Sequence, residues 1–282
     1  MRLGVISGRA AIVRGDRAAD VARASGGSLP ADPMALLERW DEAREWAATL
    51  PASEYDTPVV EDELQAPVPR PRQVFAVALN YPPHAAEAGF TPPEDPLVFT
   101  KFPTCVTGPR TIVDLPDGKV DWEVELVAVI GRPAHRVRED RAWEAVAGLT
   151  VGQDLSERVT QLRGKPAQFS LGKSFPGFGP TGPALVTPDE LDDPDDLEIT
   201  GLLNGAVVQH DRTKSMIFPV PELIARLSAI VPLLPGDLIF TGTPAGVGNR
   251  MDPPRYLTAD DELVSRISGI GEIRQRFARP PS

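Results

Sequence analysis

The sequence predicts an α+β protein whose larger part is built on a β-sandwich or roll. Short apolar runs that suit buried strands cluster after residue 68, and few helical patterns interrupt them. Before residue 68 the chain reads as a hairpin, a helix and a proline-containing connector. Strands that cluster together with few helices between them disfavour a doubly wound nucleotide-binding sheet. We therefore predict a small N-terminal α+β domain over residues 1–67 and a larger domain over 68–282.

Each element of the N-terminal domain has a local signal. Apolar residues flank Ser7-Gly8, which predicts a short hairpin within residues 1–15. Asp32 is a suitable N-cap, Pro33 suits the first helical position, and apolar residues recur at helical spacing as far as Leu50. The prolines between residues 51 and 71 indicate an extended connector.

The larger domain carries mainly strand signals. Asn204-Gly205 between two apolar runs is a strong hairpin signal, and Pro221 marks the first turn of one clear helix over 220–231. The remaining signals predict strands at 74–79, at 122–130, after the Pro-Gly-Asp turn at 235–237, and on both sides of the turn at 269–271.

Composition limits the classes of partner. The 282 residues carry a net charge of −11, which disfavours nucleic acid and anionic membrane surfaces but not a small anionic substrate. No apolar run is long enough to span a bilayer, and the N-terminus lacks the apolar core of a signal peptide. With a single cysteine, Cys105, these features predict a cytoplasmic protein without disulfides.

The pair Glu123 and Glu125 is the first candidate for chemistry. On a strand, residues two apart point to the same face, with Cα atoms about 6.6 Å apart. An exposed polar face is the ordinary alternative. However, the same face continues as Val127 and Val129, which favours burial, and two buried carboxylates require a cation. Oxygen ligands suit Mg²⁺, Mn²⁺ or Ca²⁺, and Asp154 offers a third carboxylate unless it only caps a turn.

Two further clusters are candidates with open alternatives. His84 and Glu87 lie three apart at a predicted helix start, where a carboxylate could orient a histidine as general base, or both could be solvated. Lys173 lies between Leu171 and Phe175, so it is either a partly buried cation that needs an anion or a solvated lysine. The glycine-rich run 240–248 is either a ligand-binding loop or an ordinary one.

Together these segments resemble the fumarylacetoacetate hydrolase family. The resemblance covers about residues 68–277 and rests on motifs in the family's order: ALNYPPHAAE, DWEVELVAVIG, GQDLSERV, LGKSFPGFGPTGP, NGAVVQ, LPGDLIFTGTPAGVG and GNRMDPP. It implies a mixed β-sandwich roll, usually a homodimer, and the first segment resembles the small N-terminal domain of longer members. Gln153 and Pro176 depart from the family pattern, which puts the usual substrates of the family in question.

The resemblance also implies roles for individual residues. Glu123, Glu125 and Asp154 would bind the metal, and His84 and Glu87 fall where related acylpyruvases carry a water-activating dyad. Lys173 would assist catalysis. Positions that line the substrate site are matched by Tyr81, Arg158, Gln168 and Thr243.

The resulting hypothesis is a Mg²⁺-dependent hydrolase, with Mn²⁺ or Ca²⁺ as other options, that cleaves a carbon–carbon bond in an acylpyruvate-like 2,4-dioxo acid. Isomerisation, decarboxylation or hydration of a 2-oxo or 2-hydroxy-dienoic acid would use the same centre. A non-catalytic protein that kept the fold is the alternative of a different class.

Overall fold

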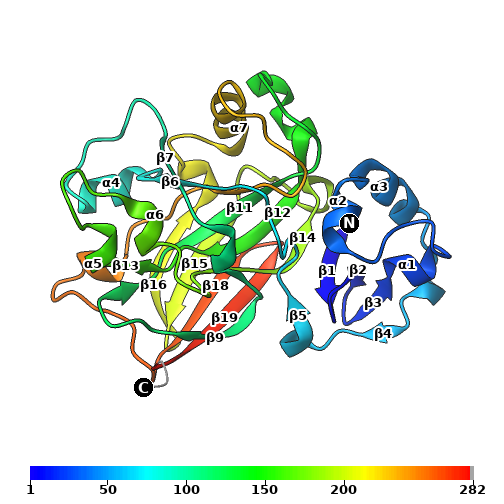
Figure 1. The fold of residues 1–282 in the computed structure, drawn as a ribbon, viewed down its shortest axis with the longest axis horizontal. Coiled ribbons are helices and arrows are strands. Elements are labelled where there is room, and N and C mark those ends of the chain that lie inside the picture. Colours follow the sequence, from blue (N-terminus) through cyan, green and yellow to red (C-terminus); the bar gives the residue numbers. More distant parts are fainter. Residues whose placement is uncertain (280–282) are drawn as a thin grey trace.

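The computed structural model describes residues 1–279 and confirms the α+β class. Figure 1 shows two large sheets at the centre of the molecule, with the N-terminal elements beside them. The larger sheet has the strand order β4-β3-β2-β1-β14-β12-β11-β17-β6-β7, and β5 and β8 pair with β1 and β14. The smaller has the order β16-β15-β18-β19-β9. Both mix directions, since β17–β6 and β19–β9 are parallel pairs.

The strands of the larger sheet are β1 (Arg2–Ile6), β2 (Arg9–Arg14), β3 (Arg17–Asp20), β4 (Thr57–Pro58), β5 (Leu64–Gln65), β6 (Val74–Ala78), β7 (Leu97–Thr100), β8 (Val106–Thr107), β11 (Val124–Ile130), β12 (Val146–Gln153), β14 (Gly179–Val186) and β17 (Leu238–Phe240). The smaller sheet contains β9 (Arg110–Asp114), β15 (Glu198–Leu203), β16 (Ala206–Arg212), β18 (Glu262–Ile267) and β19 (Gly271–Ala278). A separate pair is formed by β10 (Val120–Asp121) and β13 (Ser156–Glu157).

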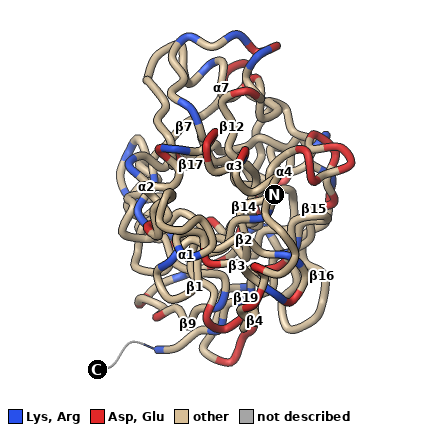
Figure 2. The backbone as a smooth tube through the Cα atoms, turned by 90° about the vertical axis from the view of Figure 1, so that its right-hand side faces the viewer, with Lys and Arg blue, Asp and Glu red and all other residues tan. Residues whose placement is uncertain are grey.

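The helices are short and lie at the periphery (Figure 1): α1 (Val21–Ala24), α2 (Pro33–Leu37), α3 (Trp40–Ala48), α4 (Pro82–Glu87), α5 (Arg158–Gln161), α6 (Phe169–Gly172) and α7 (Val220–Ser228). Among the described residues, none of these helices is long and apolar enough to cross a membrane. Figure 2, seen from the N-terminal side, shows acidic and basic residues interspersed rather than gathered by sign.

Strand β11 joins two hydrophobic cores because its two faces are both buried. Val124, Leu126 and Ala128 pack in the core that also holds residues of the smaller sheet and of α7. Val127 and Val129, on the other face, pack in a second core together with residues of the N-terminal segment. The predicted burial of the face that carries the glutamates is confirmed.

The N-terminal segment continues the larger sheet. Its hairpin β1–β2 turns at Ser7-Gly8 as predicted, and β1 pairs with β14 of the larger domain. The domain boundary near residue 68 stays a prediction, since strands from both sides of it pair within the same sheet.

One predicted helix is wrong in its extent. The helix expected from Pro33 to Leu50 is interrupted between α2 and α3, where Arg39 leaves helical geometry with φ −118° and ψ 37°. Asp32 nevertheless caps the first piece, because its carboxylate accepts a hydrogen bond from the Ala35 N–H at 3.0 Å. The hairpins at Asn204-Gly205 and between β18 and β19 are confirmed.

Candidate active site

The antiparallel register of β11 and β12 brings three carboxylates together. Val124 pairs with Gln153, so the start of β11 lies beside the end of β12. Asp154 directly follows β12, and its N–H donates to the Glu123 carbonyl oxygen at 2.9 Å. One carboxylate oxygen each from Glu123, Glu125 and Asp154 lies within 4.8 Å of the others, and all three residues are buried.

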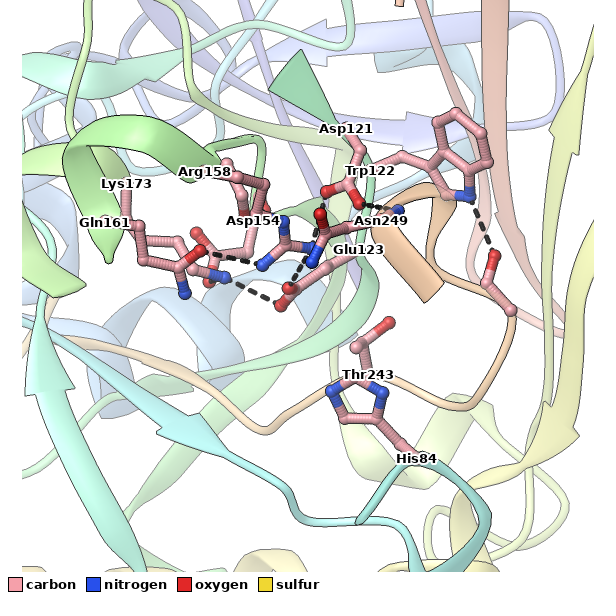
Figure 3. Close-up of polar contacts among 12 residues, drawn as sticks. His84, Asp121, Trp122, Glu123, Asp154, Arg158, Gln161, Lys173, Thr243 and Asn249 are labelled. Carbon is pink, nitrogen blue, oxygen red and sulfur yellow. Dashed lines mark hydrogen bonds and ion pairs between the residues drawn. The ribbon is translucent and has the colours of Figure 1, made fainter. Parts of the chain in front are cut away.

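Three buried cations surround these carboxylates, and Figure 3 shows two of them, Lys173 and Arg158. Lys173 Nζ donates to Glu123 Oε2 and to Asp154 Oδ2, both at 2.7 Å. Lys101 Nζ donates to the other oxygen of Asp154 at 2.6 Å and to two main-chain carbonyls. Arg158 contacts Glu123 Oε1 at 2.8 Å. Lys173 and Arg158 therefore hold the carboxylates of the cluster in place.

Glu125 is the carboxylate that these cations leave uncompensated. Its side chain accepts a hydrogen bond from the Gly242 N–H at 2.8 Å. Burial, together with Asp154 and Glu123, raises the pKa of Glu125 well above its usual range. Although burial opposes it, Lys173 and Arg158 lower the pKa of Glu123 to about 2. Among the described residues, no cationic side chain forms an ion pair with Glu125.

A hard divalent cation fits this cluster. With Asp121 the site holds four buried carboxylates against three buried cations, so an anionic charge remains when all are ionised. The donor atoms offered to an ion are carboxylate oxygens alone, which suits Mg²⁺, Mn²⁺ or Ca²⁺ rather than a soft metal.

Arg158 is fixed from two sides. Its guanidinium contacts Asp121 Oδ1 at 2.5 Å and donates to Gln161 Oε1 at 2.9 Å. Asp121 in turn accepts from the Asn249 main-chain N–H at 2.5 Å (Figure 3). The loop that follows β17 is thereby attached to the carboxylate cluster.

His84 and Glu87 form the expected pair on α4. His84 Nδ1 lies 2.7 Å from Glu87 Oε1, and the other oxygen of Glu87 accepts from the Gly246 N–H at 3.0 Å. Pro82 and Pro83 start the helix, so the three-residue spacing places both side chains on one face. A carboxylate that binds Nδ1 leaves Nε2 free to exchange a proton.

One cavity of about 610 Å³ is lined by His84 of the dyad and by Glu123 of the carboxylate cluster. Its polar wall includes His84, Glu123, Lys173 and Thr243 (Figure 3). Arg158 and Gln168 also line it, as the resemblance implies. Thr243 is held in place because its hydroxyl donates to the Val124 carbonyl at 2.9 Å and accepts from Gln209 at 2.8 Å.

One residue lies elsewhere than predicted, and the structure places two departures from the family pattern. Tyr81 is fully buried in the core beside α4 and is not part of the cavity wall. Pro176 is exposed and likewise does not line the cavity. The departure at Gln153 has a local role, since its amide accepts from the Glu123 N–H at 2.8 Å and donates to Ser265 at 3.0 Å.

Lys101, Asp121, Gln161 and Asn249 belong to the site but were not identified from the sequence. Lys101 follows an apolar strand and lies between Phe99 and Phe102, which is the one local signal of a buried lysine. Asp121 has no such local signal, since its role depends on the pairing of β10 with β13.

Comparison with known proteins gives a consistent picture. The family model described as "Fumarylacetoacetate (FAA) hydrolase C-terminal" matches residues 73–278. Mitochondrial oxaloacetate tautomerases of Rattus norvegicus and Homo sapiens are 41% and 43% identical, over 87% of this chain and 79% of theirs.

The solved structures described next match this chain over its full length. An HpcE protein from Mycobacterium smegmatis is 54% identical with a TM-score of 0.95, and all of both chains is covered. Maleylpyruvate hydrolase from Sphingobium sp. SYK-6, solved with manganese(II) and pyruvate, is 27% identical with a TM-score of 0.83, again over all of both chains. On the extent of these matches, the chain belongs to the fumarylacetoacetate hydrolase family.

Proposed function

We propose that this protein catalyses keto–enol tautomerisation of a 2-oxo acid that chelates a divalent cation at Glu123, Glu125 and Asp154. The observation that carries the proposal is that His84, hydrogen-bonded to Glu87, and Glu123 of the carboxylate cluster line one cavity. The oxaloacetate tautomerases among the relatives support this reaction class.

In this proposal each residue of the site has its own role. The chemistry that a bound divalent ion supplies is Lewis acidity toward an oxo-acid oxygen. His84 takes a proton from the carbon next to the oxo group and returns it to the oxo oxygen, so that no atom is gained or lost. Glu87 orients the ring and stabilises its protonated form. Lys173 and Arg158 hold the carboxylate of Glu123 in place.

The test is a comparison of His84→Asn and Glu87→Gln with the unmodified protein, using oxaloacetate as probe with Mg²⁺ or Mn²⁺. Keto–enol interconversion, followed by ultraviolet absorbance, should fall at least 100-fold in His84→Asn, while metal binding by calorimetry stays unchanged. His210→Asn is the matched control, because His210 is an exposed histidine that lies near Glu198 and does not line the cavity. Full activity of His84→Asn would refute the assignment.

Carbon–carbon bond hydrolysis of an acylpyruvate-like 2,4-dioxo acid is the second candidate. The same dyad could take a proton from water, and maleylpyruvate hydrolase is among the structural relatives. Acetylpyruvate distinguishes the two reactions, because hydrolysis releases acetate and pyruvate whereas tautomerisation leaves its mass unchanged. Release of both products at the rate of enol consumption would favour hydrolysis.

The choice of Mg²⁺, with Mn²⁺ or Ca²⁺ as options, remains a proposal, as do the homodimer and the cytoplasmic location. The dependence of activity on each ion tests the choice of metal, and analytical sedimentation tests the homodimer.

A further inference from the structure

The cavity is larger and more apolar than a short oxo acid requires. Its volume of about 610 Å³ lies in the range that drug-sized ligands occupy. Beyond the polar wall described above, more than half of the residues that line it are apolar, among them Val77, Phe99 and Phe169. A small dicarboxylate bound at the metal ligands would leave this part of the cavity in contact with water.

Phe99 marks where the charged part meets the apolar part. Lys173 Nζ, which holds Glu123 and Asp154, lies 5.4 Å from the centre of the Phe99 ring. The same ring packs edge-to-face against Phe169, with ring centroids 5.7 Å apart. A ligand that starts at the carboxylates therefore continues over aromatic surface contributed by β7 and α6.

Several of the apolar side chains in this region are also exposed. Of eleven exposed large apolar side chains among the described residues, four line this one cavity: Phe90, Leu97, Val98 and Leu162. Apolar groups concentrated at one site, on segments 88–99 and 162–169 that flank the carboxylates, are typical of a ligand-binding surface.

We propose that the natural substrate is a 2-oxo acid with an apolar tail of several carbons, aliphatic or aromatic, rather than a short dicarboxylate. The head binds at Glu123, Glu125 and Asp154, and the tail lies over Phe99 and Phe169 toward Val98 and Leu162. This inference rests on the proposed function, because that function places the oxo-acid head at the carboxylates.

N-substituted oxamates test the inference, since oxamate is an unreactive analogue of a 2-oxo acid. Calorimetry with the full-length, Mn²⁺-loaded protein compares oxamate with N-ethyl and N-butyl oxamate, and with an oxamate whose tail of equal length ends in a carboxylate. The affinity should rise about fourfold for each buried methylene, and the carboxylate-ended tail should give no such gain.

A pair of matched variants locates the tail. Val98→Thr keeps the shape of the side chain but adds a hydroxyl at the cavity wall, and should cut the gain from the butyl group several-fold while leaving oxamate affinity unchanged. Ile230→Thr, at a residue 82% exposed outside the cavity, should change neither.

The failures of the two proposals are distinguishable. If oxamate binds and the alkyl tails give no gain, the apolar tail is refuted and the oxo-acid head stands. If oxamate does not bind in the presence of Mn²⁺, both are refuted. A gain that Val98→Thr leaves intact would place the tail elsewhere and overturn the site proposed here.

Discussion

At the scale of single residues, the buried charges of the active site are unequally compensated. Lys173 contacts Glu123 and Asp154, and Lys101 contacts Asp154, whereas Glu125 receives only a main-chain N–H. Glu125 is therefore the carboxylate of the cluster whose ionisation costs most free energy.

Replacing Glu125 by Gln should separate metal binding from folding. The amide keeps an acceptor for Gly242 and removes a repelled carboxylate, so the metal-free protein should melt at the same or a higher temperature. The increase in melting temperature on adding Mn²⁺ should disappear, because a ligand is lost. Differential scanning calorimetry with and without Mn²⁺ measures both quantities. An unchanged response to Mn²⁺ would show that Glu125 does not bind the ion.

Lys101 makes a second prediction at this scale. It is 1% exposed, and its ammonium neutralises one oxygen of Asp154. Lys101→Met would leave that carboxylate short of a partner and should lower the free energy of unfolding by about 3–5 kcal/mol, as for other broken buried pairs. Urea denaturation measures the change. Lys214→Met, which breaks an exposed pair with Asp196, is the control and should have little effect.

At the scale of elements, the turn between β15 and β16 also orders the start of β18. Asn204 and Gly205 have φ of 51° and 81°, as a two-residue hairpin turn requires. The Asn204 amide donates to Asp261 Oδ1 at 2.7 Å, and its oxygen accepts from the Glu262 N–H at 2.8 Å. One side chain therefore supports both the turn and the neighbouring strand.

Asn204→Ala should destabilise the protein by about 2 kcal/mol, because it removes both hydrogen bonds and disfavours the positive φ. Asn204→Gly should cost less, since glycine tolerates that φ and only the hydrogen bonds are lost. Thermal denaturation of the two variants measures which of them is less stable. Ser7→Ala, at the equivalent position of the first hairpin with φ 51°, should be nearly neutral; an equal loss there would rule out the amide contacts as the cause.

The elements also show why the site was only partly predictable from the sequence. The strand and turn signals around Glu123, Glu125 and Asn204 are local, as is the spacing of His84 and Glu87, so they could be recognised without tertiary information. Asp121 joins the site through the pairing of β10 with β13, which no local pattern encodes, and the flanking phenylalanines of Lys101 indicate burial without indicating which carboxylate it contacts. Tyr81 was assigned to the substrate although its ring packs in the core, because a motif position does not specify which way a side chain points.

At the scale of the whole molecule, the N-terminal segment and the larger domain share one core. Leu3, Leu37 and Trp40 pack in the same buried cluster as Val129 and Leu185. The sheet is likewise continuous, since Arg2 and Leu3 of β1 pair with Val186 and Leu185 of β14. Val127 and Val129 lie on the same face of β11 as Glu125, so this shared core adjoins the carboxylate cluster along the strand.

The intact chain should therefore unfold in a single transition, and a chain that lacks residues 1–67 should not fold to a stable form. Removing the segment would expose Leu185 and the edge of β14, which favours aggregation through both apolar contact and strand pairing. Scanning calorimetry of the full chain should give equal calorimetric and van't Hoff enthalpies. Two resolved transitions, or a truncated chain that still gains thermal stability from Mn²⁺, would instead establish residues 1–67 as an independent domain.

Coupling through the shared core further predicts the effect of Trp40→Ala, a change far from the carboxylates in sequence. It should lower the melting temperature of the whole molecule rather than of the first segment alone.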